Sequence, residues 1–574
     1  MYTFRELQKA AKKKVDGKEV RIAVLGNCAT QFFSNAVQGY SKKVGMNVNL
    51  YDADYNQIDA QLLDRNSEVL KFEPDNIILW LGTEKIYEEF LDINLEERNG
   101  FADMYIQKIL HYWELIEKNS HARIIQLNFC EIDDKVMGNY SCKVESTFIY
   151  QIRKLNFLLQ EKMKDRKSVY PVDILSIQIK IGERDFYDAP LYYNAKMNVS
   201  INALPYLAKA VVDVLVAING NIKKCVICDL DNTLWGGIIG DDGMGGIQIG
   251  ELGAGHAFTN LQRWIKQLKE YGIILAICSK NNEDTAKEPF ECHEEMVLRM
   301  NDIALFVANW NDKATNIKMI QKGLNIGMDS IIFLDDNAFE RNLVRNLIPE
   351  IEVPELPEDP ALYLEYIQEQ NYFETASYTG ENMDRTKQYQ AEFQRKKLEL
   401  SFTSIDDYLK SLNMIGTVNR FEPMRYARIA QLTQRSNQFN LRTIRYTEDE
   451  IEKIAEDESY IPLYYTLQDK FGEHGLVSVL ILQVKSDKEV FIDTWLMSCR
   501  VLKRGMEEFI INEMVEIVGK NGYEKISAEY IPTSKNKMVE KIYEKMGFSF
   551  IGENHYELYI KNYKKQNVFI LKDD

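Results

Sequence analysis

The chain has 574 residues, of which 45% are hydrophobic and 27% are charged, a composition typical of soluble globular proteins. This length is too great for one hydrophobic core and predicts about three or four domains. The formal net charge of −17 argues against a nucleic-acid partner, because non-specific binding to phosphates needs a basic surface. No run of about eighteen apolar residues is present, so we expect no association with a membrane. The amino terminus lacks the apolar core of a signal peptide, which predicts a cytoplasmic protein with reduced cysteines.

Short apolar runs alternate with helical stretches along most of the chain, which predicts a multidomain α/β protein. In the second part, each apolar run ends in acidic or hydroxyl residues. The predicted parts are an α/β domain at residues 1–220, a second at 221–365, a polar helical connector at 366–420 and a last unit at 421–574. Cys225 and Cys228 form a Cys-x-x-Cys pattern, but they lie in an apolar run without a nearby histidine cluster. We therefore interpret them as buried strand cysteines rather than as metal ligands or a redox pair.

One apolar run of the second part ends in residues suited to phosphoryl transfer. In KKCVICDLDNTLWGG, Asp229, Asp231 and Thr233 follow the predicted strand at alternate positions, where open α/β sheets place their chemistry. Asp229 can attack phosphorus and form an aspartyl-phosphate. Asp231 can protonate the leaving oxygen and later activate water. Two carboxylates facing a phosphate repel it, so the pattern needs a hard divalent cation, and Mg²⁺ fits best.

Three later segments supply the other parts of such a site. The run GIILAICSKN carries Ser279 near its end, and this hydroxyl can hold phosphoryl oxygens together with the groups that follow it. Lys313 can neutralise the charge on Asp229 and on the phosphoryl group. The run DSIIFLDDN carries Asp335 and Asp336, which are natural ligands of a hard cation. The predicted site comprises Asp229, Asp231 and Lys313 for catalysis, Thr233, Ser279, Lys280 and Asn281 for phosphate binding, and Asp229, Asp231, Asp335 and Asp336 for the metal.

The order D-x-D-x-T, Ser, Lys and D-D resembles the motif set of the haloacid dehalogenase (HAD) superfamily. The wider segments DLDNTLWGGIIGDDG, ANWNDKATNI and FLDDNAFER are similar to one branch, the FkbH-like proteins of subfamily IIIC, across residues 221–360. This resemblance implies a HAD-like Rossmannoid domain with phosphatase or phosphotransferase activity. Only fifty residues separate Asp229 from Ser279. That interval has room for a flap at residues 235–250 but not for a large cap domain.

The carboxy-terminal part resembles the GNAT fold, an α+β fold that binds acyl groups. In that fold a turn with the pattern R/Q-x-x-G-x-G/A holds the pyrophosphate of coenzyme A at the start of a helix. Arg500 and Gly505 match the pattern, whereas Lys503 replaces its first glycine. This departure favours the phosphopantetheine arm of an acyl carrier protein over free coenzyme A. The residues predicted to bind the acyl group or the pantetheine are Cys499, Arg500, Lys503, Arg504, Gly505, Asn536 and Tyr543.

Other carboxy-terminal residues leave two interpretations open. Asn437, Gln438 and Asn440 lie in RIAQLTQRSNQFNLRTIRY, a segment that also resembles the FkbH-like family. They either line an acceptor pocket or cap the preceding helix. Cys499 is the first candidate for an acyl-thioester on the enzyme, with a packed strand cysteine as the alternative. His474 begins a predicted strand, and we interpret it as structural rather than catalytic.

The amino-terminal part resembles a degenerate form of the flavodoxin-like SGNH hydrolase fold. Asn27 or Cys28 stands where that fold has its nucleophilic serine, and no histidine lies between His121 and His256. Because a catalytic base is missing, we expect a scaffold or docking role rather than hydrolysis. A lowered pKa of Cys28 at a helix start is the alternative. The segment similar to the end of this domain in FkbH-like proteins contains Tyr192, Lys196 and Met197.

The resemblance to FkbH-like proteins implies a two-step function. A phosphorylated three-carbon acid loses its phosphate, and its glyceryl-type acyl group passes to the phosphopantetheine thiol of an acyl carrier protein. One alternative is a stand-alone phosphatase of small molecules whose GNAT-like domain only binds an acyl or nucleotide ligand. The other is a binding protein whose carboxy-terminal domain is a sensor. The stand-alone phosphatase would be favoured if turnover needed no carrier and residues 421–565 could be removed without loss of activity.

Overall fold

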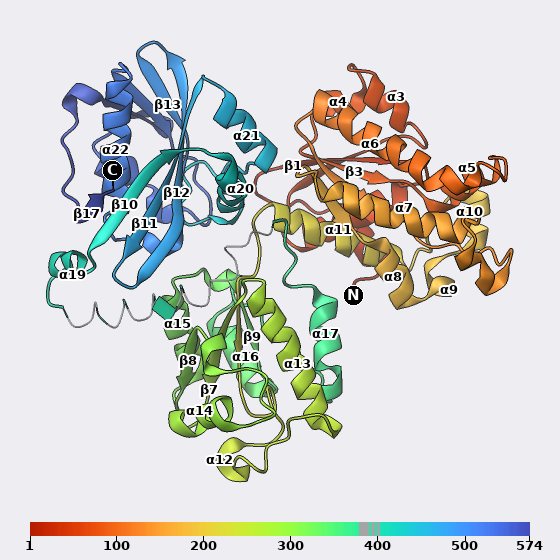
Figure 1. Cartoon of the computed structure of the whole chain (residues 1–574), viewed down its shortest axis with the longest axis horizontal. Helices are drawn as coiled ribbons and strands as arrows, with labels where there is room; N and C mark the ends of the chain where they lie inside the picture. The colour runs from red at the N-terminus through yellow and green to blue at the C-terminus, as the bar shows by residue number, and fades with distance from the viewer. Residues whose placement is uncertain (378–387, 389, 392–394, 396–397, 399–401, 574) are drawn as a thin grey trace. The chain divides into compact units, whose positions relative to one another are not determined.

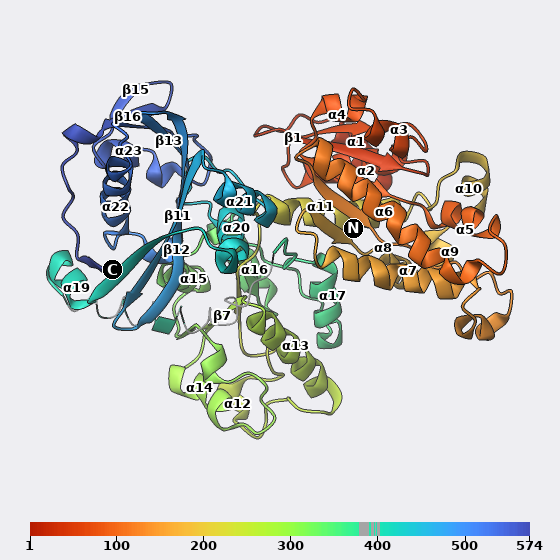
Figure 2. The same cartoon turned by 45° about the horizontal axis from the view of Figure 1, so that its top comes forward.

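The structure is a computed structural model that describes residues 1–377, 388, 390, 391, 395, 398 and 402–573. The chain divides into two compact units, Met1–Val216 and Ala217–Asp574. Figures 1 and 2 show the helices and strands of both units. Among the described residues, no helix is both long enough and apolar enough to cross a membrane.

The first unit contains a parallel sheet of five strands in the order β2-β1-β3-β4-β5. Its strands are β1 (Val20–Gly26), β2 (Val48–Asp52), β3 (Asn76–Trp80), β4 (Arg123–Leu127) and β5 (Val169–Val172). Its helices are α1 (Phe4–Ala11), α2 (Gln31–Lys43), α3 (Ile58–Leu63), α4 (Glu68–Phe72), α5 (Thr83–Leu91), α6 (Phe101–Asn119), α7 (Phe148–Met163), α8 (Ile174–Ile181), α9 (Glu183–Phe186), α10 (Ala189–Ala195) and α11 (Leu204–Ile218). Strands β1 and β3 are buried along most of their length, as expected for a parallel sheet covered on both faces. The predicted α/β architecture is confirmed.

The second unit begins with a parallel sheet of four strands in the order β8-β7-β6-β9. Its strands are β6 (Cys225–Cys228), β7 (Ile274–Ser279), β8 (Leu305–Ala308) and β9 (Ile331–Leu334). Its helices are α12 (Ile239–Asp242), α13 (Gly253–Glu270), α14 (Glu283–Cys292), α15 (Lys313–Leu324), α16 (Ala338–Leu347) and α17 (Tyr363–Gln370). Cys225 and Cys228 are fully buried free thiols, which confirms that they are strand cysteines. Tyr363 and Ile367 of α17 pack into the same core as β6, so this domain extends beyond the predicted boundary at residue 365.

A mixed sheet of eight strands forms the rest of the second unit, in the order β15-β16-β14-β13-β12-β11-β10-β17. Its strands are β10 (Met414–Arg420), β11 (Tyr460–Asp469), β12 (Gly472–Ser486), β13 (Glu489–Met497), β14 (Lys525–Glu529), β15 (Ser549–Gly552), β16 (His555–Tyr559) and β17 (Ile570–Lys572). Its helices are α19 (Ile405–Ser411), α20 (Tyr426–Arg435), α21 (Glu448–Glu456), α22 (Met506–Lys520) and α23 (Ile542–Lys545). One core lies against α22 and another against α20 and α21. Strand β10 begins before the predicted boundary at residue 421, because it completes the sheet between β11 and β17.

Strands β13 and β14 are parallel but pair only over their first four residues. Beyond that point a short extended segment fills the gap between them. The carbonyl of Phe439 accepts a hydrogen bond from Met497 N (3.1 Å), and Leu441 N donates to the carbonyl of Trp495 (3.2 Å). On the other side, the carbonyl of Leu441 accepts from Ile531 N (2.9 Å). The chain therefore supplies its own strand-like segment to the opening between β13 and β14.

Candidate active site

The carboxyl ends of β6 and β9 bring three aspartates together. Strand β6 consists of four buried residues, and Asp229 is the first residue after it. Strand β9 lies beside β6 and is followed directly by Asp335 and Asp336. One carboxylate oxygen of each aspartate lies within 4.8 Å of the others. Neighbouring parallel strands end at the same edge of the sheet, which is why segments a hundred residues apart in sequence meet here.

Lys313 lies against this cluster from the start of α15. Its Nζ is 2.7 Å from Asp229 Oδ2 and 2.5 Å from Asp335 Oδ2, and all three side chains are buried. Burial alone would lower the pKa of the Lys313 ammonium, but the charges of Asp229 and Asp335 outweigh this effect and raise it. Lys313 is therefore a permanent cation that joins the nucleophile candidate to the second strand end, as the sequence predicts.

The three carboxylates carry more negative charge than one ammonium can neutralise. Burial, and then the charge of Asp229, raise the pKa of both Asp335 and Asp336. Asp229 Oδ1 is buried and has no hydrogen-bond partner among the described residues. The cluster offers only oxygen ligands, and one of its buried oxygens has no hydrogen-bond partner among the described residues. This arrangement suits a hard divalent cation such as Mg²⁺. Asp229, Asp335 and Asp336 are the residues that could hold it.

The carboxylate of Asp231 is engaged by other groups and lies outside this cluster. Its Oδ1 accepts hydrogen bonds from Trp235 Nε1 (3.0 Å) and Ile239 N (3.0 Å), and its Oδ2 accepts from Asn281 Nδ2 (2.8 Å). This departs from the prediction that its side chain is a metal ligand, because its oxygens face the donors of the flap and of the loop after β7. The same contacts hold Asp231 in one orientation, as a general acid and base requires.

The predicted phosphate-binding side chains mainly tie the loops of the site to one another. Thr233 Oγ1 accepts from Asp336 N (3.1 Å), and Asn281 Nδ2 donates to Ser279 Oγ (3.2 Å) as well as to Asp231. Lys280 Nζ forms an ion pair with Glu340 at 2.6 Å. The structure thus brings all four residues to the carboxyl edge of the sheet, and direct contact with a phosphate stays a prediction.

The turn between β13 and α22 holds its two arginines inside the domain. Arg504 Nη1 lies 3.0 Å from His474 Nε2 and 3.5 Å from Asp469 Oδ2, and Arg500 Nε donates to Ser498 Oγ at 3.2 Å. Both guanidinium groups are buried. This differs from the prediction that both arginines bind the pantetheine. Internal partners hold Arg504, whereas Arg500 also lines the cleft described below. Lys503 is exposed and has φ 64°, in the left-handed region typical of the glycine that it replaces.

His474 belongs to the buried network around Asp469. Its Nε2 is 3.2 Å from Asp469 Oδ2. Burial, assisted by the charges of Arg504 and Arg395, lowers the pKa of His474 to about 4, although Asp469 opposes the shift. The imidazole is therefore neutral at neutral pH and fixed between charged groups, which supports the structural interpretation.

Two residues predicted to contact the pantetheine are instead buried parts of the fold. Tyr543 is fully buried, and its ring packs against Trp495, Phe548 and Tyr556. Asn536 is also fully buried. Neither side chain lines the cleft described below.

Asn536 connects the segment between β13 and β14 to the loop that precedes α23. Its Nδ2 donates to the carbonyls of Asn440 and Ile531, both at 2.9 Å, and its Oδ1 accepts from Thr533 N at 2.7 Å and from Tyr530 Oη at 3.1 Å. This one amide therefore satisfies four polar groups, two of them in buried hydrogen bonds and two in partly buried ones.

Replacing Asn536 with alanine is expected to destabilise the protein by roughly 2–4 kcal/mol, because several buried polar groups lose their partner. Urea denaturation followed by tryptophan fluorescence measures the change in the free energy of unfolding. Lys537→Ala is the matched control, since Lys537 is the exposed neighbour. Equal stability of the two variants would contradict this role of Asn536.

The three amides predicted to form an acceptor pocket have different positions. Asn440 is fully buried, with Nδ2 donating to the carbonyl of Ser436 (3.3 Å) and Oδ1 accepting from Thr443 N (2.8 Å). Asn437 Nδ2 donates to the carbonyl of Gly220 at 3.2 Å. Asn437 and Gln438 line the cleft, whereas Asn440 does not.

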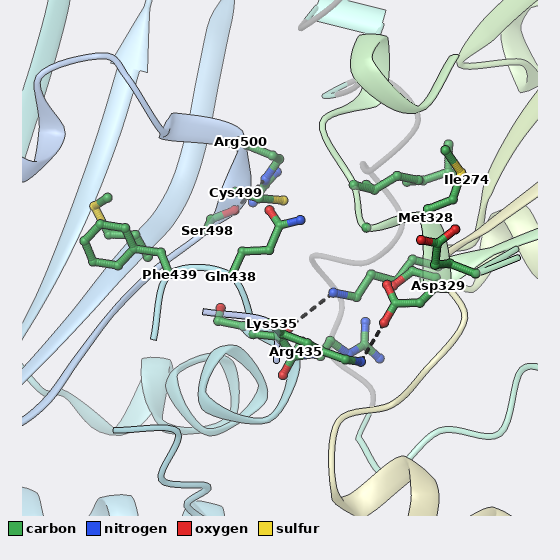
Figure 3. A pocket seen from close by; sticks show the side chains of 18 of the residues that line it. Ile274, Met328, Asp329, Arg435, Gln438, Phe439, Ser498, Cys499, Arg500 and Lys535 are labelled. Carbon is green, nitrogen blue, oxygen red and sulfur yellow. Dashed lines mark hydrogen bonds and ion pairs between the residues drawn. The ribbon is translucent and has the colours of Figure 1, made fainter. Parts of the chain in front are cut away.

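A cleft of about 710 Å³ lies within the second unit, between the loop before β9 and the end of β13. Gln438, Ser498, Cys499 and Arg500 line it from the carboxy-terminal domain, and Figure 3 shows the Gln438 amide directed toward the thiol of Cys499. Five of the eight cysteines are buried and two are exposed, whereas Cys499 is partly exposed. Cys499 is the one cysteine of the eight that lines this cleft.

In the first unit, the turn after β1 is closed rather than open. The carbonyl of Lys196 accepts a hydrogen bond from Ala29 N (3.0 Å), and Asn27 Oδ1 accepts from Gly82 N (2.6 Å). Cys28 is buried, and burial raises the pKa of its thiol. This corrects the alternative that Cys28 has a lowered pKa, because desolvation of the thiolate dominates over its position before α2.

Tyr192, Lys196 and Met197 form part of this closure. Tyr192 Oη donates to Glu88 Oε1 at 2.7 Å, and Lys196 Nζ lies 3.3 Å from the same oxygen. Met197 is buried. These contacts hold α10 and the residue after it against α5, and they give this segment a structural role.

The full-length protein is expected to show no turnover of activated acetyl esters at Cys28. Its buried thiol should react with iodoacetamide roughly tenfold or more slowly than the exposed Cys142, because the thiolate is the reactive form. Alkylation of each peptide, followed by mass spectrometry, measures the two rates. Ester turnover that disappears in Cys28→Ala but persists in Cys142→Ala would show that the first unit is catalytic.

Comparison with known proteins bears on both units. The family model described as the N-terminal domain of FkbH matches residues 21–216. A crystal structure of the N-terminal part of the protein BF1531 from Bacteroides fragilis contains a phosphatase domain complexed with Mg. It is 44% identical to this chain, with a TM-score of 0.63, over 66% of this chain and 100% of that one. The chain belongs to the FkbH-like family. No curated protein sequence matches it.

The carboxy-terminal region of this FkbH-like protein has more distant structural neighbours. The ribosomal-protein-S18-alanine N-acetyltransferase from Escherichia coli covers 25% of this chain with 15% identity and a TM-score of 0.20. Ard1 from Thermoplasma volcanium also covers 25%, with 17% identity and a TM-score of 0.20. The alignments include 94% of each neighbour. With TM-scores this low, the GNAT-like fold of this region stays a prediction.

Sequence reasoning missed two residues that position the FkbH-like centre. Arg341 is buried, and its Nη1 donates to the carbonyls of Asp335 (2.9 Å) and Asp336 (2.6 Å). Trp235 is fully buried and orients Asp231. Both lie in segments that are similar to the FkbH-like family, but their local sequence pattern is that of an ordinary amphipathic helix and an ordinary flap. It therefore does not indicate their roles.

Proposed function

We propose that this protein is a Mg²⁺-dependent HAD-type phosphatase that acts through an aspartyl-phosphate on Asp229. The observation that carries the proposal is the cluster of Asp229, Asp335, Asp336 and Lys313 at one edge of a parallel sheet. The phosphatase domain of the Bacteroides relative, which was crystallised with Mg, supports it. The substrate class is a phosphorylated small molecule.

The chemistry follows from the positions of the side chains. Asp229 attacks phosphorus, and the bond between phosphorus and the leaving oxygen breaks while Asp231 gives that oxygen a proton. Asp231 then removes a proton from water, which attacks phosphorus and releases Asp229 and inorganic phosphate. Lys313 balances the negative charge of the transferred group. A bound Mg²⁺ would supply further positive charge for the phosphoryl oxygens.

We further propose that the carboxy-terminal domain transfers a glyceryl-type acyl group to the phosphopantetheine thiol of a carrier protein. A free carboxylate does not acylate a thiol, so the donor class is a three-carbon acid activated as an acyl phosphate. The Cys499 thiolate attacks the acyl carbon, the bond to phosphate breaks, and a thioester forms. The carrier thiolate then attacks that thioester and releases Cys499. The support is the partly exposed position of Cys499 in a lined cleft.

Incubation with the phosphorylated three-carbon acyl phosphate and a phosphopantetheinylated carrier is expected to increase the carrier's mass by one acyl group. Cys499→Ala should abolish this transfer, because the intermediate thioester cannot form. Intact-mass spectrometry of enzyme and carrier measures both events. Cys142→Ala is the control, since Cys142 is an exposed thiol of the other unit. Full transfer in Cys499→Ala would remove Cys499 from the mechanism.

A stand-alone phosphatase remains the second candidate because the two centres occupy opposite edges of one sheet. Asp229 follows β6, whereas Lys224, just before β6, lines the cleft. Four strand residues span about 13 Å at roughly 3.3 Å each. One small substrate therefore does not touch both centres. Phosphatase turnover without any carrier acylation in the wild type would favour this candidate.

A further inference from the structure

The cleft that contains Cys499 is rich in positive charge within an acidic protein. Six cationic side chains and two acidic ones, Asp329 and Glu350, line it, although the whole chain has a net charge of −17. The cationic residues are Lys224, Lys318, Arg428, Arg435, Arg500 and Lys535. Such a concentration of one sign attracts a ligand of the opposite sign.

The phosphatase edge of the same sheet has the opposite character. Exposed acidic side chains lie on the flap and at the starts of α13, α14 and α15. They are Asp241, Asp242, Glu251, Glu283, Asp284 and Asp312. The acidic edge therefore repels anions, whereas the basic cleft attracts them. An anionic ligand is drawn to the cleft unless the phosphatase centre binds its phosphoryl group specifically.

Individual cations in the cleft have charge that internal partners leave uncompensated. Lys318 is exposed, and it forms no ion pair with any residue in the described part of the chain. Arg500 is buried, and the groups that it contacts in the described part of the chain are neutral: Ser498 Oγ at 3.2 Å, the carbonyl of His474 at 3.5 Å and the amide oxygen of Gln388. A buried cation without a counter-ion is costly, so an anion in the cleft would stabilise Arg500. Lys535 shares its charge with Asp329 at 2.6 Å.

We propose that this cleft is a second binding site for a phosphate ester, separate from the phosphatase centre. Lys318, Lys535 and Arg500 hold the phosphate end of the ligand, and the other end reaches the thiol of Cys499. The volume of about 710 Å³ is in the range of small-molecule and cofactor sites. In Figure 3, Lys535 and Arg500 lie on different sides of the Gln438 and Cys499 side chains, so one elongated ligand can contact both.

The ligand class of this site rests on the acyl transfer proposed above. Two phosphate esters share the required chemistry. One is the phosphopantetheine arm, which carries a thiol at the end remote from its phosphate. The other is the phosphorylated acyl donor, which carries the reactive carbonyl away from its phosphomonoester. Both would place a phosphate on the cations and a reacting atom at Cys499.

Protection of Cys499 from alkylation tests the site without measuring turnover. The full-length protein in EDTA is treated with iodoacetamide in the presence of 4′-phosphopantetheine, 3-phosphoglycerate or inorganic phosphate, and unphosphorylated pantetheine is the comparison for the first probe. Cys142 and Cys292 are exposed and serve as internal references. The double variant Lys318→Glu/Lys535→Glu removes the two exposed cations. Lys322→Glu/Lys541→Glu is the control, because both lysines are exposed and neither lines the cleft.

At ten times its dissociation constant, a bound phosphate ester should slow alkylation of Cys499 by roughly tenfold, with Cys142 and Cys292 unchanged. The protection should be lost in Lys318→Glu/Lys535→Glu and kept in the control variant. The protecting ester identifies the source of the ligand. If neither ester protects, if pantetheine protects equally, or if protection survives the double reversal, the site is refuted even where wild-type enzyme acylates a carrier. Protection without carrier acylation would instead refute the proposed transfer alone.

Discussion

Replacing Asp229 with asparagine is expected to reduce phosphatase activity to background. An amide oxygen is a poor nucleophile, and the change also removes the carboxylate that pairs with Lys313 at 2.7 Å. Loss of one nucleophile typically costs as much as loss of the whole catalytic set. Hydrolysis of p-nitrophenyl phosphate in the presence of Mg²⁺ measures the effect. Addition of EDTA to the wild type should give the same result, because Asp335 and Asp336 then lack the cation that we propose.

Asp241→Asn is the matched control for this experiment. Asp241 is an exposed aspartate of the flap, so the same chemical change outside the cluster should leave activity near that of the wild type. A thermal melt of each variant separates loss of chemistry from loss of folding. Wild-type activity in a folded Asp229→Asn protein would show that the nucleophile is a different group.

Asp231→Asn is expected to slow hydrolysis of alkyl phosphates by roughly 10²–10⁴, the usual contribution of a positioned acid and base. Asparagine can keep a hydrogen bond with Trp235 or Asn281, so the change removes proton transfer more than geometry. The first step with p-nitrophenyl phosphate should lose much less, since its leaving oxygen needs no proton. Rapid-quench kinetics with both substrates measure the difference.

Equal losses with both leaving groups would contradict an acid role for Asp231. Asp242→Asn provides the control, because Asp242 lies on the same flap and is exposed. The comparison therefore tests whether the Asp231 carboxylate, which lies outside the cluster of the other three aspartates, donates a proton rather than binds the cation.

The sequence predicts the central cluster well because local rules determine it. A short apolar run must form a buried strand, and the residue after that strand must reach the edge of the sheet. Asp229 and Asp335 obey this rule on the neighbouring strands β6 and β9. Lys313 begins α15, the helix that follows β8. The residue types at these strand ends and helix start, and their order along the chain, therefore predict that the side chains meet.

The parts that sequence reasoning could not predict depend on contacts between distant segments. Asn440 and Asn536 look like exposed polar residues of a binding site, but both are buried. Asn536 Nδ2 donates to the backbone carbonyl of Asn440 at 2.9 Å, and the Asn440 side chain bonds to Ser436 and Thr443 in its own segment. The sequence suggests that Arg504 is a surface cation, but in the structure it is buried and its Nη1 lies 3.5 Å from Asp469 Oδ2. The predicted end of the second domain at residue 365 is too early, also because of contacts between distant segments. Helix α17 completes a core built from residues over a hundred positions earlier.

Trapping of the phosphoenzyme tests the central claim most directly. In Asp231→Asn the second step should be slow, so brief reaction with p-nitrophenyl phosphate and Mg²⁺, followed by acid quenching, should leave one phosphoryl group on the protein. Peptide mapping by mass spectrometry identifies the modified residue. We expect that residue to be Asp229 and the signal to be absent from Asp229→Asn/Asp231→Asn. A phosphoryl group on any other residue, or product formation with no covalent intermediate, would contradict the account.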